Sequence, residues 1–554
     1  MKQEHLVIVG GVAAGMKAAA RARRIDPNIR ITVYEEKGYV SYAACGLPYY
    51  TSGVVKEQKE LVLRTPEEFR RPFDIQVHTN HRVTKIAPQN KQIVAFDLNK
   101  REEICQPYDR LILAIGAKPV VPPLPGVNLP RIFTIKTLED ASSIRGYIAR
   151  EQPQKAVIVG AGLIGLEMAE SLVSCGLQVT LIEMMNQVLP PLDEDMAYIL
   201  EKHLLAKGIR LSKENPVEAF EGDTKSGVRR VITKSARFDT DLVILSIGVR
   251  PNTRLAEEAG IVLGRTKAIK VDERMLTNIP DIYAAGDCSE TRSLITGEPT
   301  WVPLGSTANK QGRVAGENAA GGSAFFQGVL GTMIAKVLDY TVGKTGLSEN
   351  EANRHGYEIE RAVIWPNSRA HYYSGAKDML VKIIAEKRSY RVLGAQIIGE
   401  NGVDERVDAI ASAMAQGATF EDLQGLDLAY APPYSPAIDP IIVAGNVLSN
   451  KSLGLLKGIS AEDLKRKLDN GQEYTLLDVR DHEEYEKGHI PGAKLIPLGE
   501  LRERLGELSR DQDVITYCLQ GIRSYNALRI LQGNGFTKTM NLDGGINMWR
   551  WHLA

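Results

Sequence analysis

Residues 6–15 read Leu-Val-Ile-Val-Gly-Gly-Val-Ala-Ala-Gly, and an alanine-rich stretch follows them up to Arg24. A continuous apolar run is typical of a strand buried on both faces, and the alanine-rich stretch is typical of a helix. A second strand is predicted over residues 29–34, and Glu35 follows it, 20 residues past Gly15. Strand, glycine turn, helix, strand and acid in this order predict a dinucleotide-binding fold. Helix amides there bind the pyrophosphate, and the carboxylate binds ribose hydroxyls.

The same order recurs about 150 residues later, with strands predicted over residues 156–159 and 178–182 and an acid at Glu183. This second copy has the complete set of glycines: Gly160, Gly162 and Gly165. The first copy departs from the G-x-G-x-x-G motif, because Val12 stands in place of its middle glycine. An acid at Glu183 suits a free 2′-hydroxyl and repels a 2′-phosphate, so NADH is favoured over NADPH. Two copies predict two bound dinucleotides.

Composition bounds the class of protein. The 554 residues are enough for roughly three or four domains, and 68 basic residues balance 68 acidic ones. No overall field therefore favours nucleic acid or an anionic membrane as a partner. No apolar run approaches the ~18 residues of a membrane span, and the short run at residues 6–9 is a buried strand rather than a signal-peptide core.

Cysteine usage predicts a reducing cytoplasm. The five cysteines are Cys45, Cys105, Cys175, Cys288 and Cys518. No two of them have the short spacing of a metal site, so no metal is expected, and an odd number argues against a disulfide framework.

Three further segments complete the pattern of the first 445 residues. Residues 111–116 close the first half, residues 242–252 close the second, and residues 277–287 (Thr-Asn-Ile-Pro-Asp-Ile-Tyr-Ala-Ala-Gly-Asp) return to the first domain. Together they resemble the flavoprotein disulfide reductases that bind two dinucleotides. The resemblance implies FAD in the first fold and NADH in the second. The FAD residues would be Gly10, Gly11, Ala14, Gly15, Glu35, Ala114, Gly116 and Asp287, with Asp287 on the ribityl chain. The NADH residues would be Gly160, Gly162, Gly165 and Glu183.

A lone cysteine follows the first dinucleotide fold, in residues 41–50, Ser-Tyr-Ala-Ala-Cys-Gly-Leu-Pro-Tyr-Tyr. Dithiol flavin reductases carry a second cysteine five positions after the first, where this chain has Tyr50. Cys45 therefore needs a redox partner from outside: a small thiol, disulfide or persulfide. The segment resembles the single-cysteine branch of the pyridine nucleotide-disulfide oxidoreductases, which includes coenzyme A disulfide reductases, NADH oxidases and NADH peroxidases. Helix-terminal amides and the flavin are expected to hold the pKa of Cys45 below ~8.5.

The general acid is predicted to be a tyrosine. Dithiol members of the family carry a His-Glu pair in the region that matches residues 428–440, which here contains no histidine but has Tyr430 and Tyr434. A further pair, Tyr372-Tyr373, follows His371. Coenzyme A disulfide reductases use tyrosines of the partner subunit in this role, and a phenol keeps its proton at pH 7. We favour Tyr372 and Tyr430, with Tyr434 in reserve; ordinary core or interface aromatics are the alternative.

Basic residues favour coenzyme A as a ligand. Lys17, Arg21 and Arg24 are spaced i, i+4, i+7 and share one helix face. Within the family, the segment matching residues 61–73 also contacts the nucleotide. The expected coenzyme A residues are Lys17, Arg21, Arg24, Ser41, Arg64 and Arg70; a solvated basic face is the alternative. Ala44 stands where relatives carry an asparagine that orients the pantetheine arm, so the identity of the thiol ligand stays open.

The pattern restarts near residue 458. Asp478-Val-Arg, Gly488-His-Ile-Pro-Gly-Ala and Asp543-Gly-Gly resemble a single rhodanese domain. A strand predicted over residues 513–517 runs into Cys518, and a helix begins at the far end of the loop. The amides and helix dipole favour a thiolate and cradle an anionic persulfide. Four residues separate Cys518 from Arg523, whereas tyrosine phosphatases have five. The tighter ring favours sulfur transfer, with Cys518 and Arg523 as catalytic residues.

The predicted fold is α/β: two doubly wound dinucleotide-binding domains, an α+β dimerisation domain and a C-terminal α/β rhodanese domain. Helices are expected over residues 407–416 and, after a Ser460 cap, over residues 461–468. The predicted boundaries are 1–115 with 253–324 for FAD, 116–252 for NADH, 325–445 for dimerisation, 446–457 for a linker and 458–554 for rhodanese.

The predicted activity is an FAD-dependent reduction of persulfide, polysulfide or coenzyme A persulfide by NADH. It yields thiol and hydrogen sulfide through Cys45, with sulfur transfer at Cys518, in a homodimer. Coenzyme A disulfide reduction is the first alternative, an NADH oxidase or peroxidase the second, and a non-enzymatic redox sensor or sulfur carrier the third.

Overall fold

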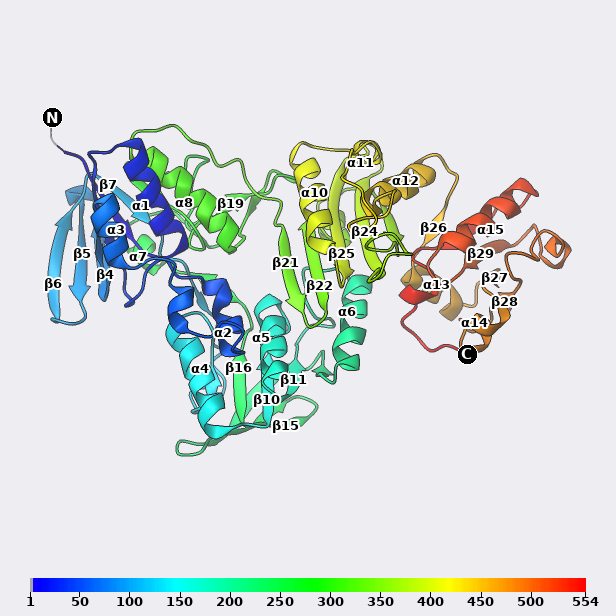
Figure 1. Cartoon of the computed structure of the whole chain (residues 1–554), viewed down its shortest axis with the longest axis horizontal. Coiled ribbons are helices and arrows are strands. Elements are labelled where there is room, and N and C mark those ends of the chain that lie inside the picture. Colours follow the sequence, from blue (N-terminus) through cyan, green and yellow to red (C-terminus); the bar gives the residue numbers. More distant parts are fainter. Residues whose placement is uncertain (1–2) are drawn as a thin grey trace. The chain divides into compact units, whose positions relative to one another are not determined.

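The structure, a computed structural model, describes residues 3–554 in two compact units (Figure 1). The first runs up to Val188 and resumes from Leu204 to Val329; the second comprises Leu189–His203 and Leu330–Ala554. No helix of residues 3–554 is long and apolar enough to cross a membrane.

A five-stranded parallel sheet organises the first dinucleotide-binding domain, in the order β18-β7-β1-β2-β3. Its strands are β1 (His5–Val9), β2 (Arg30–Tyr34), β3 (Ile75–His78), β7 (Arg110–Leu113) and β18 (Ile282–Ala284). The central strand β1 is buried along its whole length, as its continuous apolar run predicts. An antiparallel sheet accompanies it, made of β4 (His81–Ala87), β5 (Gln92–Asp97) and β6 (Glu102–Pro107).

Two helices of this domain touch backbone to backbone. Helix α1 (Ala13–Ile25) packs along α8 (Gly305–Ala319), as Figure 1 shows. A Cβ placed on Gly312 would lie 2.3 Å from the carbonyl oxygen of Ala14, and one on Gly15 would lie 1.8 Å from that of Gly10. Only glycine leaves room for these approaches. Gly15 therefore permits the tight turn before α1, and Gly312 permits α8 to pack closely against α1.

The second dinucleotide-binding domain repeats the design, with strand order β12-β11-β10-β16-β9. These strands are β9 (Ile132–Phe133), β10 (Lys155–Val159), β11 (Gln178–Ile182), β12 (Arg210–Ser212) and β16 (Leu242–Leu245). Its helices include α4 (Leu138–Glu151) and α5 (Leu163–Ser174). A second antiparallel sheet contains β13 (Val217–Asp223), β14 (Gly227–Thr233) and β15 (Arg237–Asp239).

The second unit begins with an antiparallel sheet in the order β21-β22-β25-β24-β23. Its strands are β21 (Met333–Val337), β22 (Tyr340–Gly346), β23 (Ile359–Ile364), β24 (Met379–Glu386) and β25 (Val392–Gly399). Helix α10 (Val403–Ala415) packs on β22 and β25, and α12 (Pro440–Ser452) packs on β23 and β24. Helix α10 confirms the helix expected near residues 407–416. Shorter helices are α9 (Glu349–Arg354) and α11 (Phe420–Gln424).

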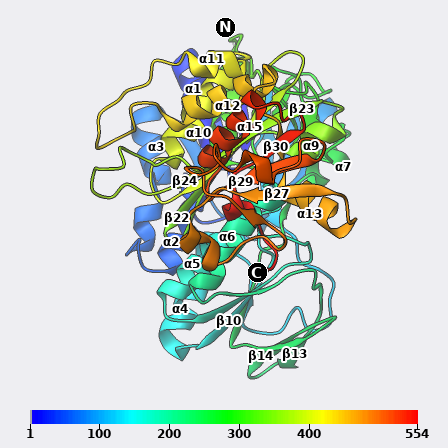
Figure 2. The ribbon, with the colours of Figure 1, turned by 90° about the vertical axis from the view of Figure 1, so that its right-hand side faces the viewer.

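The last part of the chain forms a parallel sheet in the order β26-β30-β29-β27-β28. Its strands are β26 (Gly458–Ile459), β27 (Tyr474–Asp478), β28 (Lys494–Leu495), β29 (Asp513–Tyr517) and β30 (Thr539–Leu542). Helix α15 (Ile522–Gly533) packs on β29 and β30 (Figure 2). Helix α13 (Ala461–Asp469) begins at the predicted cap, where the Ser460 side chain accepts from the Asp463 amide. Helix α14 spans His482–Glu486.

Two stretches differ from the predicted organisation. Residues 446–452, predicted to open a linker, are the second half of α12, because the Lys451 side chain is buried in an ion pair with Asp543. Residues 189–203, predicted within the NADH-binding domain, belong to the second compact unit. There Asp193 and Asp195 neutralise the buried Lys382.

Gly312→Ala is expected to destabilise the protein, because the added methyl group collides with the backbone of α1. Overpacking of this kind costs about 1–3 kcal/mol. At Gly146, within α4, the methyl group of an alanine would meet open space, so Gly146→Ala should stabilise by up to about 1 kcal/mol. Thermal unfolding of both variants checks the opposite signs; equal midpoints would contradict the close approach.

Candidate active sites

In both dinucleotide folds, the acid that follows the second strand accepts a hydrogen bond from the backbone of the glycine turn. The amides of Gly11 and Lys37 donate to the two carboxylate oxygens of Glu35, at 2.7 and 2.9 Å. In the second fold the amides of Ala161 and Met185 donate to Glu183 at 2.8 and 2.9 Å. Burial raises the pKa of Glu35, and these amide bonds oppose the rise. The two acids therefore occupy equivalent positions.

The turns fit dinucleotide phosphates. Helix α1 follows Val12 and α5 follows Gly162, and neither helix start has a side-chain cap. The first-turn amides are thus left for an anionic ligand, as pyrophosphate binding requires.

The predicted FAD residues meet at one edge of the first sheet. Gly10, Ala114 and Asp287 follow the parallel strands β1, β7 and β18. A Cβ on Gly10 would lie 2.1 Å from the Ala114 carbonyl oxygen. The ammonium group of Lys136 lies 3.3 Å from the Asp287 carboxylate. The carboxyl ends of the strands are where such folds hold their ligand.

The Cys45 sulfur lies beside the first residue of helix α8, although Cys45 itself belongs to another segment. It occupies a single 3₁₀ turn, Ala44–Gly46, before the short helix α2 (Leu47–Thr51). A Cβ on Gly305, the first residue of α8, would be 3.8 Å from the Cys45 sulfur. The close packing of α8 on α1 therefore places the thiol beside the predicted FAD cradle. The five cysteines are free thiols, and Cys45 is an exposed residue.

We expected the pKa of Cys45 to be depressed. This expectation is wrong as far as the chain's own groups are concerned, because together they raise that pKa. Burial of the thiol by the surrounding chain raises its pKa, and the carboxylates of Glu167 and Asp287 raise it further. Lys136 acts in the opposite direction but is the smaller contribution. The residue is exposed as a whole, yet desolvation of its thiol is the largest cause of the rise in pKa. The groups of this chain therefore favour the neutral thiol over the thiolate.

Glu167 is a residue of this site that the sequence reasoning missed. It lies on α5, two residues past Gly165, and burial together with Glu170 raises its pKa to about 7. A carboxyl group that titrates near neutrality beside a redox thiol can both accept and return a proton. Its position directly after the glycine motif was the signal available in the sequence.

The basic residues predicted for coenzyme A lie on adjoining elements of the first unit. Arg23 of α1 donates to the carbonyl oxygens of Phe73 and Asp74 at 2.8 Å, which joins α1 to the end of α3 (Pro66–Phe73). Arg64 lies over the Phe73 ring, 5.2 Å from its centroid. Lys17, Arg24 and Arg70 are exposed.

Two of the predicted coenzyme A residues, Arg21 and Ser41, have polar partners within the chain. Arg21 is paired with Glu317 of α8 at 2.5 Å, which neutralises its charge. The Ser41 amide donates to the Gly11 carbonyl oxygen at 2.9 Å, and the Leu63 amide donates to Ser41. Ser41, with φ of 49°, thus connects the glycine turn to the segment before Arg64.

The structure brings Tyr372 and Tyr430 together. Both side chains are exposed, and a hydrogen bond with the Tyr430 hydroxyl raises the pKa of Tyr372. Tyr373, Tyr434 and Ile438 are also exposed on the same two segments. These residues form an apolar surface on the dimerisation domain, of the kind that protein interfaces cover.

Cys518 lies at the centre of a loop that follows the central strand β29. The residue is 1 % exposed. The Gly521 amide donates to its sulfur at 3.1 Å, and the Ser524 hydroxyl does so at 3.4 Å. Helix α15 begins at Ile522, so its first turn also faces the loop. Backbone amides around a sulfur suit an anionic persulfide.

Arg523 is held at the rim of this loop by Glu484. The guanidinium nitrogens donate to both carboxylate oxygens at 2.6 and 2.7 Å. Hydrogen bonds from Arg523 hold the pKa of Glu484 down at about 2. Glu484 therefore stays ionised and fixes Arg523, a pairing across 39 residues that no local pattern predicts.

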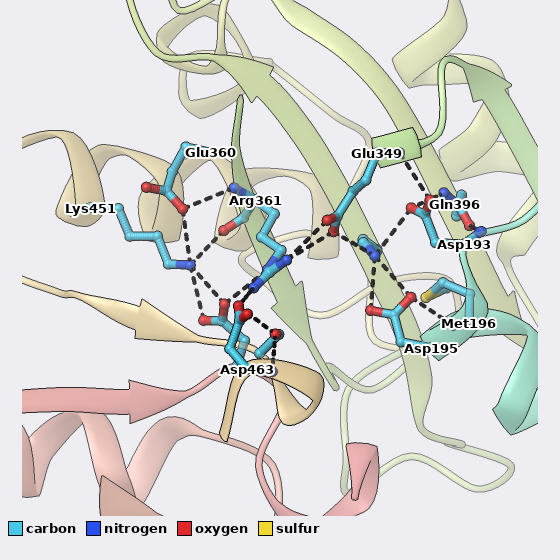
Figure 3. Close-up of polar contacts among 12 residues, drawn as sticks. Asp193, Asp195, Met196, Glu349, Glu360, Arg361, Gln396, Lys451 and Asp463 are labelled. Carbon is cyan, nitrogen blue, oxygen red and sulfur yellow. Dashed lines mark hydrogen bonds and ion pairs between the residues drawn. The ribbon is translucent and has the colours of Figure 1, made fainter. Parts of the chain in front are cut away.

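A buried ion network crosses the second unit (Figure 3). Lys382 lies within 3.1 Å of Asp193, Asp195 and Glu349. Arg361 bonds Glu349 at 2.9 Å and Asp543 at 3.2 Å. Lys451 bonds the other oxygen of Asp543 at 2.9 Å. The opposite charges raise the pKa values of Lys382 and Arg361, so both stay protonated.

Comparison with known proteins identifies the family of the chain. The family model for pyridine nucleotide-disulphide oxidoreductases matches residues 4–312, and the model for their dimerisation domain matches residues 332–441. The chain belongs to this family. A rhodanese-like domain matches residues 460–551. The predicted α/β fold and the enzyme class, a pyridine nucleotide-dependent flavoprotein reductase with a sulfurtransferase domain, are confirmed.

Similar proteins cover nearly the whole chain. A Bacillus anthracis protein described as reduced CoADR-RHD is 39% identical, with a TM-score of 0.96 over 99% of this chain and 98% of its own. The NAD-dependent persulfide reductase of A. fulgidus is 41% identical, with a TM-score of 0.93 over 99% and 100%. The "NAD(P)H sulfur oxidoreductase (CoA-dependent)" of Pyrococcus abyssi is 40% identical over 80% of this chain and 98% of its own.

Glu167→Gln should lower the pKa of Cys45, because it removes a like charge beside the thiolate. The rate of Cys45 alkylation by iodoacetamide, followed against pH in flavin-free protein, should reach its midpoint at a lower pH than in wild type. Glu139→Gln is the control, since that carboxylate acts on Tyr42 but not on Cys45. A midpoint unchanged in Glu167→Gln would remove Glu167 from the site.

Proposed function

We propose that the protein uses NADH to reduce persulfides, polysulfides or coenzyme A persulfide to thiol and hydrogen sulfide. The observation that carries this proposal is the lone thiol of Cys45 beside the predicted FAD cradle, on one chain with a rhodanese loop. Tyr50 occupies the place of a resolving cysteine, so the oxidant must come from outside the chain, and the rhodanese loop favours sulfur in that role. The names of the relatives from A. fulgidus and Pyrococcus support this substrate class.

The chain's own residues would bind the two dinucleotides. Glycine turns and the acids Glu35 and Glu183 suit FAD and NADH, and the buried Glu183 favours NADH over its 2′-phosphorylated form. When bound, FAD supplies two-electron transfer from NADH to sulfur. Asp287 and the amides of α1 hold and orient the cofactor.

The sulfur chemistry balances at Cys45. Its thiolate attacks the outer sulfur of a persulfide RSSH, the S–S bond breaks, and RS⁻ leaves to be protonated. The two electrons of NADH then reduce the Cys45 persulfide, which releases hydrogen sulfide and restores the thiol. The net reaction converts NADH, one proton and RSSH into NAD⁺, RSH and H₂S. Cys518 would receive sulfane sulfur from polysulfide and hold it as an anionic persulfide among the loop amides.

A tyrosine pair would supply the proton to the leaving thiolate. We assign Tyr372 and Tyr430 to this role, acting from the partner subunit of a homodimer. Their exposure and mutual hydrogen bond support the assignment, since a surface that reaches into a neighbouring subunit must project outward. The matched dimerisation domain supports the homodimer.

Coenzyme A is the proposed thiol. Lys17, Arg24, Arg64 and Arg70 would bind its phosphates, with Ser41 beside them; Arg21 would contribute least because Glu317 neutralises it. Coenzyme A disulfide reduction is the second candidate function, favoured by the same basic residues. Five free thiols support the cytoplasm as the proposed location. A mass spectrum of the untreated protein would show whether coenzyme A is attached, and to which thiol.

Cys45→Ser should lower the rate of NADH oxidation with polysulfide and with coenzyme A disulfide by roughly three orders of magnitude or more. Cys518→Ser should retain coenzyme A disulfide reduction and lose sulfur transfer. Peroxide should be a poor oxidant for both variants and for wild type. Turnover of persulfide that survives Cys45→Ser would refute the proposal.

Tyr372→Phe should lower NADH-dependent turnover by about 10²-fold, the usual contribution of a general acid. Tyr430→Phe should also lower the pKa of Tyr372, because it removes the hydrogen bond that raises it. The alkaline limb of the pH–rate profile would then move to lower pH, since the acid loses its proton earlier. Tyr373→Phe is the matched control; equal profiles in all three variants would exclude the pair.

A further inference from the structure

We propose that the dimerisation domain sets the geometry of the Cys518 loop (residues 518–523) through the buried pair Lys451–Asp543. Both would be positioning residues for sulfur transfer. The inference rests on the proposed function only in taking Cys518 as the sulfur carrier.

Asp543 is held from two sides by cations that precede the rhodanese domain. The Lys451 ammonium group lies 2.9 and 3.1 Å from its two carboxylate oxygens and also donates to the Arg361 carbonyl oxygen at 2.7 Å. The Arg361 guanidinium lies 3.2 Å from the same carboxylate. Figure 3 shows Lys451 and Arg361 converging on this point. The Lys451 side chain is 1% exposed, so water cannot replace these partners.

The surrounding backbone leaves little freedom for this contact. A Cβ on Gly458 would lie 2.4 Å from both the Lys451 nitrogen and an Asp543 oxygen. A Cβ on Gly544 would lie 2.9 Å from Val363 of β23. The pair and the glycine after it are therefore packed directly on the dimerisation sheet.

The turn after Asp543 passes this constraint to the Cys518 loop. The Ile546 amide donates to the Cys518 carbonyl oxygen at 2.8 Å, and the Asn547 amide donates to that of Leu519 at 3.3 Å. A Cβ on Gly545 would lie 2.6 Å from both of those oxygens. A shift of the turn must therefore move the backbone that follows Cys518, because no space separates the two segments.

The loop has a second contact with the dimerisation domain, at Gln520. The Gln520 side-chain amide donates to the Asp378 carboxylate at 2.8 Å, and Asn367 donates to the second oxygen of Asp378 at 2.8 Å. Both partners lie on the segment that carries Tyr372. The turn after Asp543 and the Asp378 carboxylate thus hold the residues directly before Gly521, whose amide donates to the Cys518 sulfur.

The test compares three lysine variants of the full-length holoenzyme. Lys451→Met removes the pair, Lys451→Arg preserves the charge, and Lys465→Met removes the lysine of a surface pair with Asp469 on α13. The first readout is the alkylation rate of Cys518 at pH 7, measured by peptide mass analysis. The second is kcat and KM for sulfur transfer from glutathione persulfide to cyanide. Reduction of the flavin by NADH reports on the reductase half.

Lys451→Met is expected to slow Cys518 alkylation about tenfold, since a displaced amide no longer stabilises the sulfur anion. It should lower kcat for sulfur transfer more than it raises KM, with flavin reduction unchanged. Lys451→Arg should restore most of the rate, and Lys465→Met should match wild type. If Lys451→Met alkylates Cys518 at the wild-type rate, the inference is wrong, whatever its thermal stability.

Asp378→Ala is a second variant that does not depend on the buried pair, because Asp378 is exposed. It should slow Cys518 alkylation about threefold, as expected for the partial loss of one hydrogen bond. Wild-type alkylation in this variant would contradict the second attachment. Alkylation reports on the surroundings of the thiol and needs no sulfur transfer. A wild-type enzyme that fails to transfer sulfur would therefore contradict the proposed function, while the alkylation rates would still test the positioning.

Discussion

The close packing of α8 on α1 is the constraint from which the redox site follows. Because Gly312 rests on the Ala14 carbonyl and Gly15 on the Gly10 carbonyl, the two helices have one possible separation. With this packing, the first residue of α8 lies beside the Cys45 sulfur. Asp287 reaches the same edge of the sheet as the glycine turn because it follows the parallel strand β18. A fold-level contact between main chains thus determines which side chains surround the thiol.

Electrostatics within the first unit act against the charged form of that thiol. Desolvation and the carboxylates of Glu167 and Asp287 all raise the pKa of Cys45. These contributions favour the neutral thiol, which reacts more slowly than the thiolate with alkylating and oxidising agents. Reactivity becomes conditional on what binds beside it. Glu167, with a pKa of about 7, is the group of the chain best able to change charge as that occurs.

The sequence was sufficient for those parts of the fold and site whose chemistry is local. Glycine turns, the acids Glu35 and Glu183, the Ser460 cap and the Cys518 loop are each defined by neighbours along the chain, and the structure places them as predicted. Glu484, Asp543 and Gln520 obtain their partners from residues tens to more than a hundred positions away, and no periodicity reports such pairings. The sequence did not predict that the predicted linker begins as a helix, for the same reason. A lysine in a polar segment is usually solvated, and only the distant Asp543 makes Lys451 a buried residue.

Gly458 and the ion pair beside it bear on how the two halves of this chain can be separated. Removal of the last hundred residues would leave Lys451 and Arg361 without Asp543, and they would keep only Glu360 and Glu349 as ion-pair partners. The rhodanese half, expressed alone, would expose an aspartate and two glycines shaped to fit a missing surface. The two halves therefore share one ion cluster, and a reductase cut at this point would present Lys451 and Arg361 to solvent.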